Sequence, residues 1–136
     1  MQTAVDSSVI LDILTADPQH ADRAEAALRK AVNEGALMVC EIVLAEIAPA
    51  FPCGGDDVVE FMNDWGLSFV PSTRQSALLA GAMFRTYLAR RAEDGPRRVV
   101  TDFLIGAHAK CTCDHLLARD RGYCRDHFKG LRLLAP

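Results

Sequence analysis

Four carboxylates of this 136-residue chain stand in or beside apolar segments, where a fold could gather them around a metal ion. Asp6 comes directly after the apolar run TAV, and Asp120 comes one residue after HLLA. Glu46 lies within EIVLAEI, and Asp102 begins the segment DFLIGAHAK. Oxygen ligands without clustered histidine or cysteine suit a hard cation, Mg²⁺ or Mn²⁺. Two such ions can activate a water and stabilise the leaving oxygen in phosphodiester cleavage, so the four acids are candidate metal ligands and catalytic residues.

Each acid has a simpler role when it is taken alone. An aspartate before a helix commonly caps it, which would account for Asp6 or Asp102. Glu46 could be a solvated helix residue, although its neighbours are unusually apolar, and Asp120 could open a turn. Only the convergence of all four favours a metal site. Asp12 follows Asp6 by six positions, on a different side of the expected helix, and is expected to be solvated.

The elements that must position these acids alternate between strands and helices. Short apolar runs predict strands at 2–5, 37–40, 67–70, 115–118 and 131–134. Helical spacing and end signals predict helices at 6–14, 17–33, 41–51, 56–65, 73–91, 102–110 (capped by Thr101) and 121–128. This alternation predicts a three-layer α/β/α sandwich with a central, mostly parallel sheet, and the length predicts one domain over 1–136.

In such a sheet, ligands bind outside the carboxyl ends of the strands, where Asp6 and Asp120 lie. The helix that begins at Asp102 is about 15 Å long and the next strand returns about the same distance, so Asp102 should reach the same edge. Glu46 should lie about 8 Å from the start of its helix, still near that edge. The four acids are therefore expected to converge.

The composition limits the classes of protein to which this chain can belong. The longest uncharged apolar stretch, SALLAGAMF, is too short to span a membrane, and MQTAVD lacks the features of a signal peptide. Five cysteines, an odd number, fit free thiols in the cytoplasm better than a disulfide framework. Residues 1–68 hold three basic and 12 acidic residues, whereas 69–136 hold 12 basic and six acidic, so one face can be basic.

Arginines near the acids are candidate contacts for the phosphate backbone of a nucleic acid. Arg119 and Arg121 flank Asp120, and Arg97 and Arg98 stand in the loop before the helix of Asp102. The alternatives are a solvated face or salt bridges to an acidic partner. Two hydroxyls beside Asp6, those of Ser7 and Ser8, either cap the helix or support the site from outside the ligand shell.

Four motifs follow one another along essentially the whole chain: VDSSVILDIL, the internal Glu of EIVLAEI, TDFLIGAHA and LLARDRGYCRDHFKGLRLL. In this order they resemble the motifs of the PIN-domain ribonucleases, and most closely those of the VapC-like toxins of toxin–antitoxin pairs. By position, Asp6, Glu46, Asp102 and Asp120 match the four metal-binding acids of that family. The resemblance implies a Mg²⁺- or Mn²⁺-dependent endoribonuclease, a homodimer, an RNA substrate and an antitoxin that occupies or distorts the site. One departure is Ala118, where the family often has Thr or Ser, and it puts full activity in question.

Three alternatives remain beside this interpretation. A phosphatase that forms an aspartyl-phosphate on Asp6 would need an acid two positions later, where Ser8 stands. A catalytically weak or inactive PIN-like domain would only bind RNA or a partner. A zinc site could be formed by five cysteine and histidine residues, although their spacing is not one of the usual zinc patterns and free thiols are the favoured interpretation. These residues are Cys111, Cys113, His115, Cys124 and His127.

Overall fold

The central element is a five-stranded parallel sheet. The structure, a computed structural model, describes residues 1–91, 93, 95, 97–119 and 122–136. The strand order is β3-β2-β1-β4-β5, and every neighbouring pair is parallel. The strands are β1 (Gln2–Val5), β2 (Ala36–Val39), β3 (Leu67–Phe69), β4 (His115–Leu117) and β5 (Arg132–Leu134).

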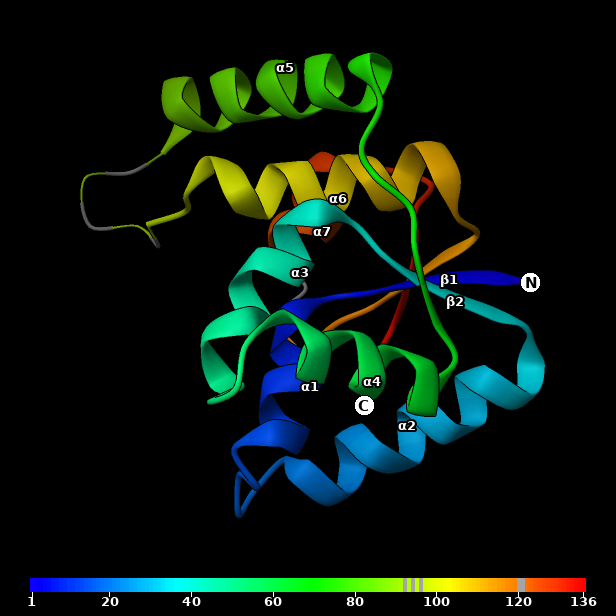
Figure 1. The fold of residues 1–136 in the computed structure, drawn as a ribbon. Helices are drawn as coiled ribbons and strands as arrows, with labels where there is room; N and C mark the ends of the chain where they lie inside the picture. Colours follow the sequence, from blue (N-terminus) through cyan, green and yellow to red (C-terminus); the bar gives the residue numbers. More distant parts are fainter. Residues whose placement is uncertain (92, 94, 96, 120–121) are drawn as a thin grey trace.

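Helices cover both faces of the sheet and confirm the three-layer α/β/α sandwich (Figure 1). On one side lie α1 (Ser7–Leu14), α2 (Ala21–Glu34) and α4 (Gly55–Trp65); on the other lie α5 (Arg74–Arg90), α6 (Val100–Thr112) and α7 (Gly122–His127). Between the two layers, α3 (Glu41–Ile47) contacts both α1 and α6. None of the helices in the described part of the chain has the length and apolar character needed to cross a membrane.

The core explains why the strand segments are apolar throughout rather than alternating. Val5, Val39, Leu116 and Leu117 are almost completely buried, because helices cover both faces of these strands. On the side of α6, Phe103 is fully buried among the rings of other aromatic residues. The two outer layers are thus held to the sheet by continuous apolar packing.

Several helix ends differ from the predicted ones for local reasons. The predicted helix 17–33 begins only at Ala21, because the Asp17 carboxylate accepts hydrogen bonds from the backbone N–H groups of Gln19 and His20 and holds a turn there. The predicted helix 41–51 ends at Ile47 and continues as a 3₁₀ turn at Ala48–Ala50, which contains a proline.

The start of α6 lies two residues before the predicted one. Thr101 was expected as the cap, but the helix begins at Val100, so Thr101 lies within it. The backbone N–H of Val99 instead donates to the Asp102 carboxylate over 3.3 Å, and this bond satisfies a free donor at the helix start. Asp102 therefore lies in the first turn of α6.

The strand order reverses at the carboxyl ends of β1 and β4. From β1 the chain continues to β2 and β3 on one side, and β4 and β5 lie on the other side. The Asp6 N–H donates to the Leu117 carbonyl over 2.9 Å, so the two strands stay paired up to this edge. Such a reversal of strand order is where open α/β sheets bind ligands.

Candidate metal centre

Asp6 lies at the end of β1, where it caps α1. Its carboxylate accepts hydrogen bonds from the Ser8 N–H over 3.2 Å and the Ser8 hydroxyl over 2.5 Å. The residue is only 8% exposed. Burial raises the pKa of the Asp6 carboxyl, the bonds from Ser8 oppose this, and the negative charge of Asp102 adds to it. Asp6 is thus both a helix cap and a buried acid whose charge is poorly compensated.

Glu46 reaches the same place from α3. Its carboxylate accepts a hydrogen bond from the Ser7 hydroxyl over 3.1 Å, which joins α3 to the start of α1. Partial burial of the carboxyl raises the pKa of Glu46 despite that bond, although the residue as a whole is exposed, and the charges of Asp6 and Asp102 raise it further. Ser7 therefore orients one candidate ligand as Ser8 orients another.

Asp102 brings a third carboxylate from α6, on the other side of the sheet. It lies close enough to Asp6 and Glu46 for its charge to raise the pKa of both carboxyls. Three of the four predicted acids thus lie near enough for their charges to interact, each from a different helix or strand end, although their carboxylate oxygens do not all lie within 4.8 Å of one another. The fourth, Asp120, lies outside the described residues, as does Arg121.

The chemistry of this donor set fits a hard divalent cation. Among the residues that the structure describes, no Lys or Arg forms an ion pair with Asp6 or Glu46. Two of the three carboxylates, those of Asp6 and Glu46, therefore have no cationic side chain paired with them. The repulsion among like charges is unfavourable unless a metal ion or protons neutralise it. Carboxylate oxygens suit Mg²⁺ or Mn²⁺, so Asp6, Glu46 and Asp102 would hold such an ion.

The arginines proposed for RNA have different surroundings. Arg119 donates from Nε and Nη2 to the two carboxylate oxygens of Asp12, over 2.8 and 3.1 Å. The prediction that Asp12 is solvated is therefore wrong: the residue is 4% exposed, because α1 turns it toward the end of β4. Arg97 is exposed, and the N–H of Arg98 donates to the Tyr87 hydroxyl over 2.8 Å.

A match to a protein-family model decides the family. The model of the PIN domain matches residues 3–127, which is most of the chain and includes all four predicted acids. The chain belongs to the PIN-domain family. The resemblance carried by the sequence motifs is thereby confirmed.

Solved structures share the fold of this PIN domain at low sequence identity. VapBC2 from Rickettsia felis, bound to a fragment of promoter DNA, has a TM-score of 0.76 at 15% identity, over 100% of this chain and 99% of the other. FitAcB from Neisseria gonorrhoeae has a TM-score of 0.65 at 18% identity, over 97% and 96%. VapC20 from Mycobacterium tuberculosis, a toxin that cleaves the sarcin-ricin loop, has a TM-score of 0.60 at 18% identity, over 96% and 98%. No curated protein sequence matches the chain.

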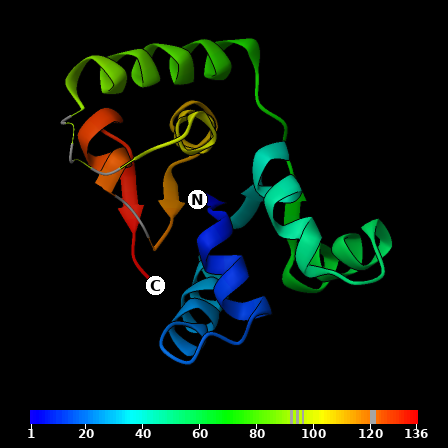
Figure 2. The same cartoon turned by 90° about the vertical axis from the view of Figure 1, so that its left-hand side faces the viewer.

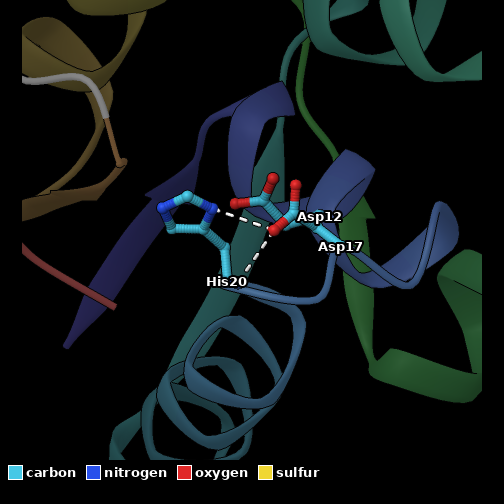
Figure 3. Close-up of side chains that lie close together, drawn as sticks. All are labelled: Asp12, Asp17 and His20. Atoms are coloured by element: carbon cyan, nitrogen blue, oxygen red, sulfur yellow. Dashed lines mark hydrogen bonds and ion pairs between the residues drawn. The ribbon is translucent and has the colours of Figure 1, made fainter.

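A second group of polar side chains in the PIN domain was not predicted from the sequence. Within the described ranges, Asp12, Asp17 and His20 are the set of three whose candidate ligand atoms all lie within 4.8 Å (Figure 3). Internal partners already engage them: Arg119 pairs with Asp12, and the His20 ring lies 3.0 Å from Asp17. A hydrogen bond from the Gln19 N–H lowers the pKa of Asp17. These contacts explain why the three side chains lie close together: they stabilise the turn between α1 and α2.

The cysteines of the PIN domain are free thiols in the structure. The proposed zinc set of cysteines and histidines near residues 111–127 does not bring three ligand atoms within 4.8 Å in the described part of the chain. Cys124 is fully buried, and burial raises the pKa of the Cys113 thiol to about 12. A thiol with so high a pKa is a poor zinc ligand.

We expect Glu46→Gln to stabilise the metal-free PIN domain at neutral pH and to change its stability little at acidic pH. Folding raises the pKa of this carboxyl, so the folded chain holds the proton more tightly and folding becomes less favourable as the pH rises through that range. A glutamine does not ionise, so it removes this loss of stability at higher pH, and it can still accept the hydrogen bond from the Ser7 hydroxyl. Melting temperatures in EDTA between about pH 4 and 8 measure the difference.

Excess Mg²⁺ is the control for this measurement. A cation bound by the carboxylates should stabilise the wild type more than the variant and cancel the variant's advantage. A variant less stable than the wild type in EDTA at neutral pH would show that repulsion among the three acids does not limit stability.

Proposed function

We propose that this PIN domain is a Mg²⁺- or Mn²⁺-dependent endoribonuclease, the toxin of a cytoplasmic toxin–antitoxin pair. The observation that carries the proposal is that Asp6, Glu46 and Asp102 lie near enough for their charges to interact at the reversal point of a parallel sheet, with raised pKa values at Asp6 and Glu46. The family membership and the fold shared with VapC-type structures support it. By its place in the family pattern, Asp120 completes the set.

The roles of the chain's own residues follow from their contacts. Asp6, Glu46 and Asp102 would hold the metal, while the hydroxyls of Ser7 and Ser8 fix two of these carboxylates. When bound, Mg²⁺ supplies a Lewis acid that lowers the pKa of water and neutralises charge on a phosphodiester. The proposed RNA contacts, Arg97, Arg98, Arg119 and Arg121, would offset the repulsion between an acidic centre and a polyanion.

The test is cleavage of a mixed pool of structured RNA by purified protein without antitoxin. We expect endonucleolytic products with Mg²⁺ or Mn²⁺ and none with EDTA. Mn²⁺ binding is measured in parallel by calorimetry, because it separates an absent metal site from an unsuitable substrate. A protein that binds no divalent metal would refute the proposed site.

A second candidate function, a catalytically weak or inactive RNA- or partner-binding domain, rests on Ala118. This residue is fully buried at the end of β4, where the family often has a hydroxyl. Its N–H donates to the Leu134 carbonyl, so the backbone there is held by β5 and not by a side-chain oxygen. Mn²⁺ binding without cleavage, together with recovered cleavage in Ala118→Ser, would favour this alternative.

We also propose that the protein forms a homodimer and binds an antitoxin, as the VapC-like resemblance implies. One candidate dimer surface is α5, which packs on α6 away from the sheet (Figure 2). Two of its leucines face solvent: Leu78 is 68% and Leu88 is 45% exposed. These leucines are apolar surface that a second copy of the chain would cover in a dimer.

We expect Leu78→Glu to shift the protein from dimer to monomer, because a charge would have to be buried in the interface. Sedimentation velocity at several concentrations measures the change. Gln75→Glu is the matched control, since Gln75 is exposed on the same helix and gains the same charge. A wild type that is monomeric at every concentration, or a variant that remains dimeric, would exclude this surface.

A further inference from the structure

Asp12 is a buried carboxylate that the acidic centre itself does not use. It lies in α1 with 4% of its surface exposed, and Figure 3 shows its carboxylate beside that of Asp17. Both of its oxygens accept hydrogen bonds from Arg119, over 2.8 and 3.1 Å. A two-point contact of this kind fixes the orientation of a guanidinium as well as its distance. Asp12 therefore anchors Arg119, a residue that lies 107 positions later in the chain.

The backbone of Arg119 connects this anchor to the acidic centre. Its N–H donates to the Ser8 hydroxyl oxygen over 3.2 Å, and the same hydroxyl donates to the Asp6 carboxylate over 2.5 Å. A hydroxyl has one proton, so an incoming N–H at its oxygen leaves that proton to be directed toward Asp6. The contacts thus form one continuous chain from Asp12 to Asp6.

We propose that Asp12 is a positioning residue for the metal-binding carboxylate of Asp6 and acts through Arg119 and Ser8. It holds Arg119 so that the backbone N–H of that residue fixes the Ser8 hydroxyl, which fixes the Asp6 carboxylate. This inference rests on the proposed metal-dependent function, because the carboxylate must be oriented for a cation. Partners outside the ligand shell commonly set the orientation and affinity of metal ligands.

The test is a double-mutant cycle between Asp12 and Ser8, with Mn²⁺ affinity measured by calorimetry on the full chain. We expect Asp12→Asn and Ser8→Ala each to weaken Mn²⁺ binding about tenfold or more. If the two residues act in one chain, Asp12→Asn should have little further effect in the Ser8→Ala background. If the ion pair of Asp12 with Arg119 only stabilised the fold, Asp12→Asn would lower the melting temperature instead. Any change that it made in Mn²⁺ affinity would then add to the change made by Ser8→Ala.

Two further variants separate positioning from charge and from folding. Glu25→Gln removes a negative charge from an exposed ion pair with Arg29, and it should leave Mn²⁺ affinity unchanged. Asp12→Asn combined with Arg119→Gln removes both charges, so no unpaired charge remains buried. We expect this double variant to fold and still bind Mn²⁺ weakly.

The outcomes distinguish this inference from the proposed function. If the wild type binds no Mn²⁺ and cuts no RNA, the proposed function fails and the inference fails with it. If the wild type binds and cuts but the folded Asp12 variants match its affinity, only the inference is overturned. Weaker binding that is non-additive with Ser8→Ala supports the positioning role.

Discussion

Asp6→Asn is expected to reduce metal-dependent RNA cleavage by more than about 100-fold, since losing a ligand should cost at least as much as losing a group that supports one. Asparagine has nearly the same shape and can still accept the Ser8 N–H bond that caps α1. It lacks the negative charge that a hard cation needs. The activity loss should therefore come without a loss of the fold.

This separation can be checked directly on the same variant. We expect the melting temperature of Asp6→Asn in EDTA at neutral pH to equal or exceed that of the wild type, because the pKa of the replaced carboxyl was raised by burial and by Asp102. Mg²⁺ should stabilise the wild type but not the variant. Cleavage rates and melting curves, with and without Mg²⁺, measure both effects.

The matched control for this substitution is Asp64→Asn. Asp64 is exposed near the end of α4, and its change to asparagine alters the net charge by the same amount. Cleavage by this control should stay close to that of the wild type. If Asp6→Asn retained most of the activity, Asp6 could not be a metal ligand of the nuclease.

Phe103→Ala is expected to lower the free energy of unfolding by about 3–5 kcal/mol. Phe103 is fully buried, and its ring centroid lies 5.2–5.5 Å from the ring centroids of His127, Phe84 and Tyr87. Truncation removes a large apolar side chain and these ring contacts, and leaves a cavity that rigid neighbours fill only in part. Since a domain is typically stable by about 5–15 kcal/mol, much of the total would be lost.

Urea unfolding of the metal-free protein, followed by circular dichroism, measures this loss. Phe69→Ala is a suitable control, because Phe69 is 48% exposed on the edge strand β3 and should cost much less. A loss below about 1 kcal/mol for Phe103→Ala would mean that the α6 layer is not held by this aromatic packing. Because Asp102 precedes Phe103, any weaker Mn²⁺ binding in the variant should be compared at temperatures where it is folded.

Much of the fold could be predicted from the sequence because its signals are local. Apolar runs marked all five strands, and helical spacing marked every long helix, since these patterns reflect which side chains the backbone turns toward a core. The alternation of the two element types was sufficient to predict a parallel sheet between helical layers. The ends of α2 and α6 were less predictable, because Asp17 and Asp102 use their carboxylates on nearby backbone N–H groups.

The candidate site was predictable in part for the same reason. The position of Asp6 follows from the end of a strand, and the place of Asp102 follows from comparing the lengths of a helix and a strand. The structure places these two acids near each other and near Glu46.

The tertiary structure alone decided the partners of Asp12, Ser7 and Ser8. By helical position Asp12 was expected to face water, yet it is buried against Arg119, and the Ser8 hydroxyl links Arg119 to Asp6. The contacts of Ser7 with Glu46, of Asp12 with Arg119 and of Ser8 with Arg119 join residues that are 39 to 111 positions apart. Local patterns determine whether a side chain lies on a strand or on a helix face. Which distant group meets that face depends on strand order and helix packing, and only the folded chain establishes these.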